Sequence, residues 1–186
     1  MRRVFLLVPV LFFLAFGVGA EEVEICFNFG CNAHARVEYN DEALAKVGRL
    51  LVEASDAGAE REALSYAVAW MYFYAGQQSP IWRDRPGNYD DEEYADGRMD
   101  CIDHSTNTTA FLRLLETRGM LRHHSVMEPV RRGRFLTLHW AARIAERDNP
   151  DPPGQYTVDT WFFEPGRPAA VFPLRDWLRG AKPVVR

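Results

Sequence analysis

The sequence predicts an α+β fold in which helices come first and an antiparallel sheet follows. Apolar residues recur at helical spacing over residues 41–52 and 59–75, and again over residues 101–118. Beyond residue 120 the pattern changes to short alternating segments at 121–130, 135–144, 156–163 and 169–172, with turn-dense connections between them. Helices grouped ahead of strands are typical of the α+β class.

Residues 1–20 have the composition of a secretory signal peptide. Arg2 and Arg3 precede an apolar run at 4–16, and small residues up to Ala20 offer a cleavage site. The run is short for a membrane span, so we expect a periplasmic or secreted protein without a membrane span after cleavage. Residues 21–186 are expected to form one domain, with an N-terminal arm and helix at 21–58 and a core at 59–186.

The charge balance argues against a nucleic-acid partner. Without Arg2 and Arg3 the chain has 20 basic and 26 acidic residues, a net charge of −6, whereas nucleic-acid affinity comes from neutralised phosphates. The acidic run at 90–93 offers oxygen ligands of the kind that calcium prefers. Calcium is therefore one interpretation of this run and a solvated loop is the other, and no other cofactor or metal is expected.

Three cysteines in an exported chain invite pairing. Cys26 and Cys31 lie five residues apart in an arm with strand-like alternation, and an oxidising compartment favours a disulfide between them. Cys101 is then left without a partner. An unpaired thiol in such a compartment is expected to be either buried or used in chemistry.

Cys101 opens the predicted helix at 101–118 and lies between Asp100 and Asp103. The positive end of a helix dipole favours a thiolate, which is the nucleophilic form of cysteine, while the two neighbouring carboxylates oppose it. A cationic partner is therefore needed. His139 on the strand at 135–144 and Asp159 on the next strand can be neighbours across an antiparallel ladder, so the three residues predict a Cys-His-Asp nucleophilic triad.

These motifs resemble the papain-like transglutaminase core. The similarity covers residues 98–126 and 136–163, with His139-Trp140-Ala141 as the histidine strand and Val158-Asp159-Thr160 as the aspartate strand. The run Asp100-Cys101-Ile102-Asp103 is most similar to the bacterial transglutaminase-like cysteine proteinases, which are exported enzymes. The resemblance implies acyl transfer from a protein or peptide substrate, with water as acceptor in a peptidase or amidase and an amine in a cross-linking transglutaminase.

Some parts of the chain differ from that pattern. Residues 104–108 (His-Ser-Thr-Asn-Thr) occupy a stretch that is usually small and apolar in such cores, and residues 21–97 match no part of the family. The backbone N–H of Cys101 would be one donor to an oxyanion. Trp82, Gln78 and Asn88 are the candidates for a second donor.

Other interpretations of the same residues remain open. The chain can instead be a catalytically silent module that binds a peptide or protein in its cleft, with Cys101 as a buried structural thiol. Asp159 can pair with Arg143 across the sheet. Cys101, His104 and His139, with a carboxylate, can also form a zinc site, because Cys-x-x-His fits one helical turn.

Overall fold

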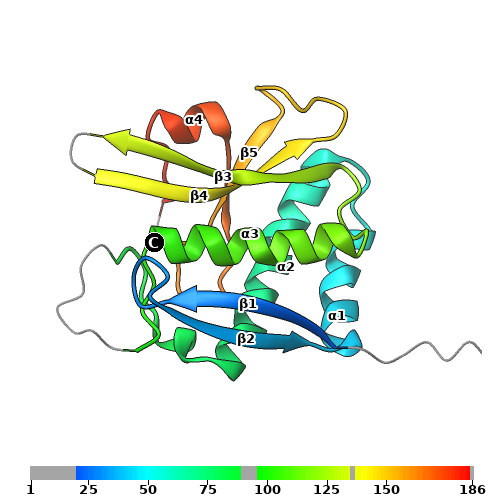
Figure 1. Ribbon diagram of the computed structural model, residues 1–186. Coiled ribbons are helices and arrows are strands. Elements are labelled where there is room, and N and C mark those ends of the chain that lie inside the picture. The colour runs from blue at the N-terminus through cyan, green and yellow to red at the C-terminus, as the bar shows by residue number, and fades with distance from the viewer. Residues whose placement is uncertain (1–19, 89–95, 135–136, 185–186) are drawn as a thin grey trace, which may run out of the picture.

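A computed structural model describes residues 20–88, 96–134 and 137–184 (Figure 1). The elements in chain order are β1 (Glu21–Phe27), β2 (Ala33–Tyr39), α1 (Asp41–Val52), α2 (Ala57–Gln78), the 3₁₀ turn η1 (Pro80–Arg83), α3 (Cys101–Thr117), β3 (His124–Arg134), β4 (Thr137–Glu146), β5 (Gln155–Asp159), β6 (Ala170–Pro173) and α4 (Leu174–Leu178). The signal peptide expected before Ala20 and the acidic run at 90–93 lie outside the described residues. Within the described ranges, no helix has the length and apolar character needed to cross a membrane.

Strands β3 to β6 form an antiparallel meander in their chain order, which confirms the α+β class. The predicted strand boundaries were partly wrong. Residues 131–134, which the prediction left as a connection between strands at 121–130 and 135–144, continue β3, so that Arg132 lies opposite His139 on β4. The register of β3 shifts between Met127 and Val130, where Pro129 has no N–H to offer the ladder.

The N-terminal arm is a hairpin of two strands, of which only the first was expected. Strand β1 pairs with β2 in an antiparallel register from Glu21↔Tyr39 to Phe27↔Ala33. Cys26 and Cys31 are joined by a disulfide that closes the hairpin loop, which confirms the pairing. Strand β2 escaped detection because its charged residues alternate with only two fully buried apolar ones, Val37 and Tyr39.

Side-chain caps explain where the first two helices begin. The Asn40 side chain accepts a hydrogen bond from the Ala43 N–H at 2.9 Å, and Asp56 accepts one from Ala59 at 2.9 Å. Each satisfies a backbone donor that has no partner inside its helix. Helix α2 is longer than the expected 59–75 at both ends: the Asp56 cap starts it at Ala57, and it continues to Gln78.

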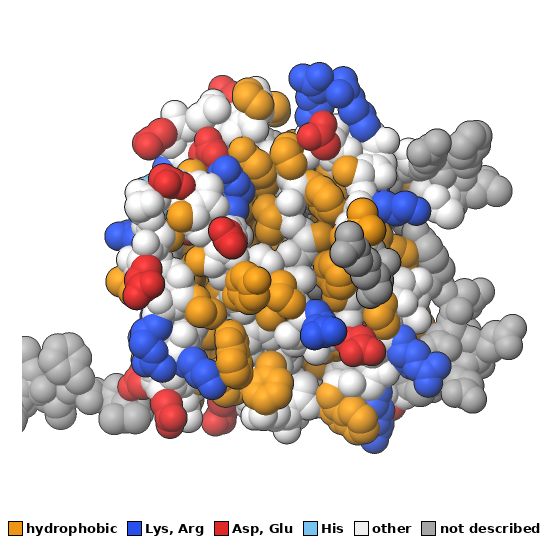
Figure 2. Space-filling model, turned by 180° about the vertical axis from the view of Figure 1, so that it is seen from behind, with side chains coloured by type: hydrophobic (Ala, Val, Ile, Leu, Met, Phe, Trp, Pro, Cys, Tyr) orange, Lys and Arg blue, Asp and Glu red, His pale blue; other side chains and the backbone are white. Residues whose placement is uncertain are grey.

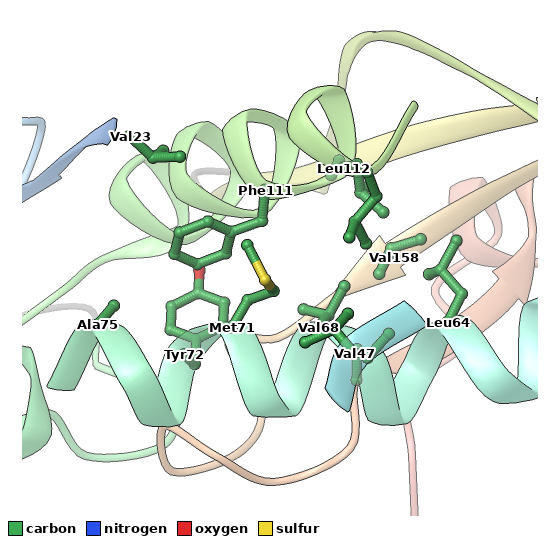
Figure 3. Packing of buried hydrophobic residues seen from close by; sticks show 14 of the residues in the cluster. Val23, Val47, Leu64, Val68, Met71, Tyr72, Ala75, Phe111, Leu112 and Val158 are labelled. Atoms are coloured by element: carbon green, nitrogen blue, oxygen red, sulfur yellow. The ribbon is translucent and has the colours of Figure 1, made fainter. Parts of the chain in front are cut away.

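Helix α2 runs through the middle of the molecule behind α3 (Figure 1). The side chains of Leu64, Val68 and Met71 project from α2 into the core, toward α3 and the sheet. Figure 3 shows them with their neighbours in the core. Phe111 of α3 makes edge-on contacts with the rings of Tyr39 at 5.9 Å and Tyr72 at 5.0 Å. This packing fixes α3, and with it the position of Cys101 at the first turn of that helix.

The opposite face of the molecule carries exposed hydrophobic side chains. Figure 2 shows them gathered on the face seen from behind. A groove of about 380 Å³ lies there between α2 and the segment before β6, lined in part by Tyr66, Trp70 and Phe73. The aromatic side chains of α2 are therefore only partly buried: Tyr72 is enclosed, whereas Phe73 is 45% exposed.

Candidate active site

The first turn of α3 is fixed by a reciprocal pair of aspartates. The Asp100 side chain accepts hydrogen bonds from the N–H groups of Ile102 at 2.8 Å and Asp103 at 3.1 Å. Asp103 returns the interaction by accepting the Asp100 N–H at 3.0 Å. This is a capping box, and it makes Cys101 the first residue of the helix. The two carboxylates flanking Cys101 therefore have a structural task.

The disulfide hairpin is anchored on the same helix. Asp103 also accepts the Cys31 N–H at 2.5 Å. The Asn107 amide bonds both backbone groups of Cys26, accepting its N–H and donating to its carbonyl oxygen, each at 2.7 Å. Burial raises the pKa of the Asp103 carboxyl to about 6, against the opposing effect of its N–H donors. The Cys26–Cys31 loop thus supports the helix turn that carries Cys101.

His139 of β4 and Asp159 of β5 form a buried pair between these two neighbouring strands. His139 Nε2 lies 2.7 Å from Asp159 Oδ2, and the indole N–H of Trp177 donates to the same oxygen at 2.9 Å. His139 is 4% exposed and Asp159 is 1% exposed. An ionised carboxylate only accepts hydrogen bonds, so Nε2 is assigned the proton of the neutral ring. Nδ1 is then an acceptor, and it has no hydrogen-bond partner within the described part of the chain.

Aromatic side chains enclose the His139 ring. Its centroid lies 4.8 Å from that of Trp161, 5.5 Å from Phe162 and 5.6 Å from Trp177. These contacts fix the ring orientation. They also keep water away from the His139–Asp159 bond, which strengthens that bond electrostatically.

Cys101 reaches β4 immediately beside His139. Its Sγ donates to the Leu138 carbonyl oxygen at 3.8 Å, and the Trp140 backbone N–H bonds the sulfur from the other side of His139. Burial raises the pKa of the Cys101 thiol, and the Asp100 and Asp159 carboxylates raise it further, so that the Trp140 N–H offsets them only in part. The helix dipole alone is therefore not expected to ionise the thiol. Formation of a thiolate would need a base that accepts the thiol proton.

The structure does not join all three residues of the predicted triad, because His139 Nδ1 has no hydrogen-bond partner among the described residues. Asp159 contacts His139 directly, and Cys101 contacts the peptide group that precedes His139. The alternative pairing of Asp159 with Arg143 is wrong. Arg143 instead donates to the Glu128 carbonyl oxygen at 3.1 Å and to Gln155 Oε1 at 3.4 Å.

His104 belongs to a separate buried network that the sequence did not reveal. Its Nε2 lies 2.9 Å from Asp84 Oδ2, and its Nδ1 lies 2.9 Å from the Thr160 hydroxyl. Both ring nitrogens are therefore engaged, so the zinc site with Cys101 and His139 is not assembled. Asp84 directly follows η1 and is 4% exposed. The network ties Asp84 and α3 to the residue that follows Asp159.

Two of the three candidates for a second oxyanion donor point elsewhere. Gln78 uses its amide on both backbone groups of Glu38 in β2, at 2.8 and 2.9 Å. Trp82 is 63% exposed and lies against Arg83. Asn88 is near the site, because its carbonyl oxygen accepts the indole N–H of Trp161, but its amide donates to Asp84.

Side chains of the types that bind metals lie close together where the N-terminal hairpin meets α3. Among the described residues, Cys26, Cys31 and Asp103 place ligand-type atoms within 4.8 Å of one another. Both cysteines are joined in the disulfide, so their sulfur atoms are not thiolate ligands. These three residues therefore anchor the hairpin on α3, as described above.

Comparisons with known proteins do not place the chain in a family: it matches no protein-family model, no curated protein and no solved structure. Its chemistry has to be inferred from the geometry around β4. Two features of that geometry bear on it most, namely the buried His139–Asp159 pair and the cysteine that opens α3 beside it.

Proposed function

We propose that this chain is an exported cysteine hydrolase with a papain-like, transglutaminase-like core that cleaves amide bonds in a protein or peptide. Cys101 is the nucleophile, His139 the base and Asp159 the residue that orients His139. The carrying observation is the buried His139 Nε2–Asp159 bond of 2.7 Å, which leaves Nδ1 as an acceptor without a hydrogen-bond partner in the described part of the chain. The signal-like segment at 1–20 and the Cys26–Cys31 disulfide support a periplasmic or secreted location.

The reaction begins with transfer of the Cys101 thiol proton to His139 Nδ1. The sulfur then attacks the carbonyl carbon of the scissile amide, and Asp159 stabilises the imidazolium that has formed. Nδ1–H next protonates the amine as the carbon–nitrogen bond breaks, which leaves a thioester on Cys101. Water attacks that thioester, His139 accepts the proton of the water, and the acid is released while the thiol is restored. An amine in place of water would give transfer instead of hydrolysis.

The first turn of α3 supplies electrostatic support for the developing oxyanion. Cys101 is the first helical residue, and its own backbone N–H lies close to the thiol. An N–H at a helix N-terminus carries a partial positive charge and stabilises negative charge that develops near it. The N–H groups of Ile102 and Asp103 are occupied by the Asp100 cap, so this role is assigned to the Cys101 N–H.

The surface around the thiol suits an extended chain. Ile102 next to Cys101 is 41% exposed, and Leu138, whose carbonyl contacts the sulfur, is 51% exposed. Exposed apolar side chains on both sides of a reactive group provide contact area for the side chains of a bound peptide. The buried thiol is 8% exposed, so substrate binding has to displace the Leu138 contact.

One observation favours the second candidate, a silent binding module. The Cys101 thiol donates to a backbone carbonyl oxygen, and its pKa is raised, as in an inert buried cysteine. In that case the same apolar rim would bind a peptide without cleaving it.

Covalent labelling separates the two candidates. We expect peptidyl acyloxymethyl ketones, which require an activated thiolate, to modify Cys101 in the wild-type protein, and mass spectrometry of tryptic peptides locates the adduct. The Cys101→Ala variant is the labelling control, and His139→Gln tests the base. Labelling should be accompanied by Cys101-dependent cleavage of a mixed peptide library. Binding of library peptides without labelling or cleavage would support the silent module and refute the hydrolase.

A further inference from the structure

A basic cleft of about 420 Å³ opens beside the proposed catalytic histidine. It lies between the paired strands β3 and β4 and the segment that follows α4. The lining side chains include Arg132, Thr137, His139, Arg179 and Lys182. His139 is buried, and its Nδ1 lacks a hydrogen-bond partner in the described ranges. The cleft thus borders the residue proposed to accept the thiol proton.

The charge of this cleft is opposite to that of the protein as a whole. Arg132, Arg179 and Lys182 line it, and no carboxylate is among its described lining residues, although the full chain has a net charge of −4. Three cations that face one space repel one another, and this repulsion is relieved when an anion binds between them. The arrangement of these three cations therefore favours the binding of an anion.

Arg132 is held in position for such binding. Its guanidinium donates to the carbonyl oxygens of Trp177 at 2.5 Å and Ala181 at 2.9 Å. It also lies 4.4 Å from the centre of the Trp177 ring. Trp177 in turn donates to Asp159, so the charged cleft and the His139–Asp159 pair share one rigid wall.

We propose that this cleft binds a carboxylate of the substrate next to the amide that Cys101 attacks. The inference rests on the proposed function, because it assigns a substrate class to that same site. Guanidinium and ammonium groups bind carboxylates through charge-assisted hydrogen bonds, and the Thr137 side chain adds a hydroxyl to the wall. The carboxylate belongs to an acidic residue beside the scissile bond or to the C-terminus of a peptide.

The sulfur is close enough to the cleft for a small reagent to report on it. Cys101 Sγ contacts the Leu138 carbonyl oxygen at 3.8 Å, and the residues on either side of Leu138 line the cleft. Iodoacetate and iodoacetamide have nearly the same size and alkylate the same thiolate, but only iodoacetate is an anion. The ratio of their rates at Cys101 therefore measures the local charge preference and needs no turnover.

The test compares this ratio in the wild type, in an Arg179→Gln/Lys182→Gln double variant and in Arg175→Gln. Arg175 is an exposed arginine of α4 that lines a different cavity, beside Pro152 and Pro153, so its variant controls for loss of charge at a distance. We expect the iodoacetate to iodoacetamide ratio to fall about five-fold in the double variant, since both removed cations line the cleft beside His139 and their attraction for an anion is lost with them. The ratio should change little in Arg175→Gln, and the wild-type preference should weaken in high salt. Equal ratios in the double variant and Arg175→Gln would overturn the proposal.

Protection experiments then identify the source of the carboxylate. N-acetyl-aspartyl amide presents a side-chain carboxylate, N-acetylglycine a terminal one, and N-acetyl-asparaginyl amide is the neutral control. We expect one or both acids to slow iodoacetamide alkylation of Cys101 while the control does not, and equal slowing by all three would contradict the proposal. Failure of the proposed function is a separate result, because it shows in the effect of His139→Gln on iodoacetamide alone.

Discussion

Replacing His139 by glutamine removes the base proposed for Cys101 while keeping a donor for Asp159. The glutamine amide nitrogen takes a place similar to that of His139 Nε2, which lies 2.7 Å from Asp159 Oδ2. Asp159 also keeps the indole N–H of Trp177 at 2.9 Å. The buried carboxylate thus stays hydrogen-bonded, and the variant should fold, because the cost of leaving a buried acceptor unsatisfied is avoided.

The magnitude follows from the environment of the thiol. Without the imidazole, burial and the carboxylates of Asp100 and Asp159 hold the Cys101 pKa above its reference value of 9.0, so roughly 1% of the thiol or less is ionised at pH 7. In the wild type, the proposed transfer of the thiol proton to His139 would supply the thiolate. We therefore expect iodoacetamide to alkylate the variant at least about ten-fold more slowly at pH 7.

The assay is the rate of alkylation of Cys101 by iodoacetamide from pH 5 to pH 10, followed by intact mass. Below pH 9 the wild-type rate should lie above the His139→Gln rate, and both profiles should share the rise above pH 9 that follows the raised thiol pKa. Circular dichroism of both proteins controls for folding. Identical profiles that rise only above pH 9 would refute the reasoning that His139 Nδ1 accepts the proton of Cys101.

The remaining predictions concern Asp159, Asp103 and the core. In Asp159→Asn the imidazolium loses its ionic partner, and we expect the rate of peptide cleavage to fall about 100-fold; a fall of less than two-fold would argue against its orienting role. The pKa of Asp103 is raised from 3.8 to about 6, so the folded state binds its proton more tightly than the unfolded state. Its contribution to stability is complete below pH 4 and lost as pH rises through 6, by at most about 3 kcal/mol. Urea unfolding at pH 4 and pH 7 should therefore show a larger loss of stability in the wild type than in Asp103→Asn, and equal losses would contradict the assignment. Phe111→Ala removes a fully buried ring and should lower the free energy of unfolding by about 3–5 kcal/mol; a loss below about 1 kcal/mol would mean that the core around α3 is not packed as described.

Several local features of the fold followed from the sequence because their causes are local. The caps Asn40 and Asp100 satisfy backbone N–H groups within three residues of themselves, so the starts of α1 and α3 can be predicted from residue type and position. The Cys26–Cys31 pairing was likewise predictable from a separation of five residues and an exported chain. The predicted strand boundaries were less accurate. The register shift beside Pro129 depends on how β3 pairs with β4, which local sequence does not reveal.

The candidate site was predictable only in outline. Helix and strand periodicity placed Cys101, His139 and Asp159 on a helix start and on two neighbouring strands, and the meander brings His139 and Asp159 into contact. The partners of these residues were not predictable. Trp177, which shares the Asp159 oxygen, lies on a short helix 18 residues further along the chain, and no spacing rule relates the two.

The sequence by itself thus determined the α+β class and the hairpin disulfide and singled out three candidate site residues, because periodicity, capping and short loop closure act over a few residues. Only the tertiary structure decided the chemical state of the site. The Cys101 pKa is raised and not lowered, since burial and the carboxylates of Asp100 and the distant Asp159 outweigh the backbone N–H groups of Trp140 and Cys101. The basic cleft joins Arg132 of β3 to Arg179 and Lys182 near the C-terminus. Desolvation and electrostatic coupling depend on distances between segments far apart in the chain, and packing alone sets those distances.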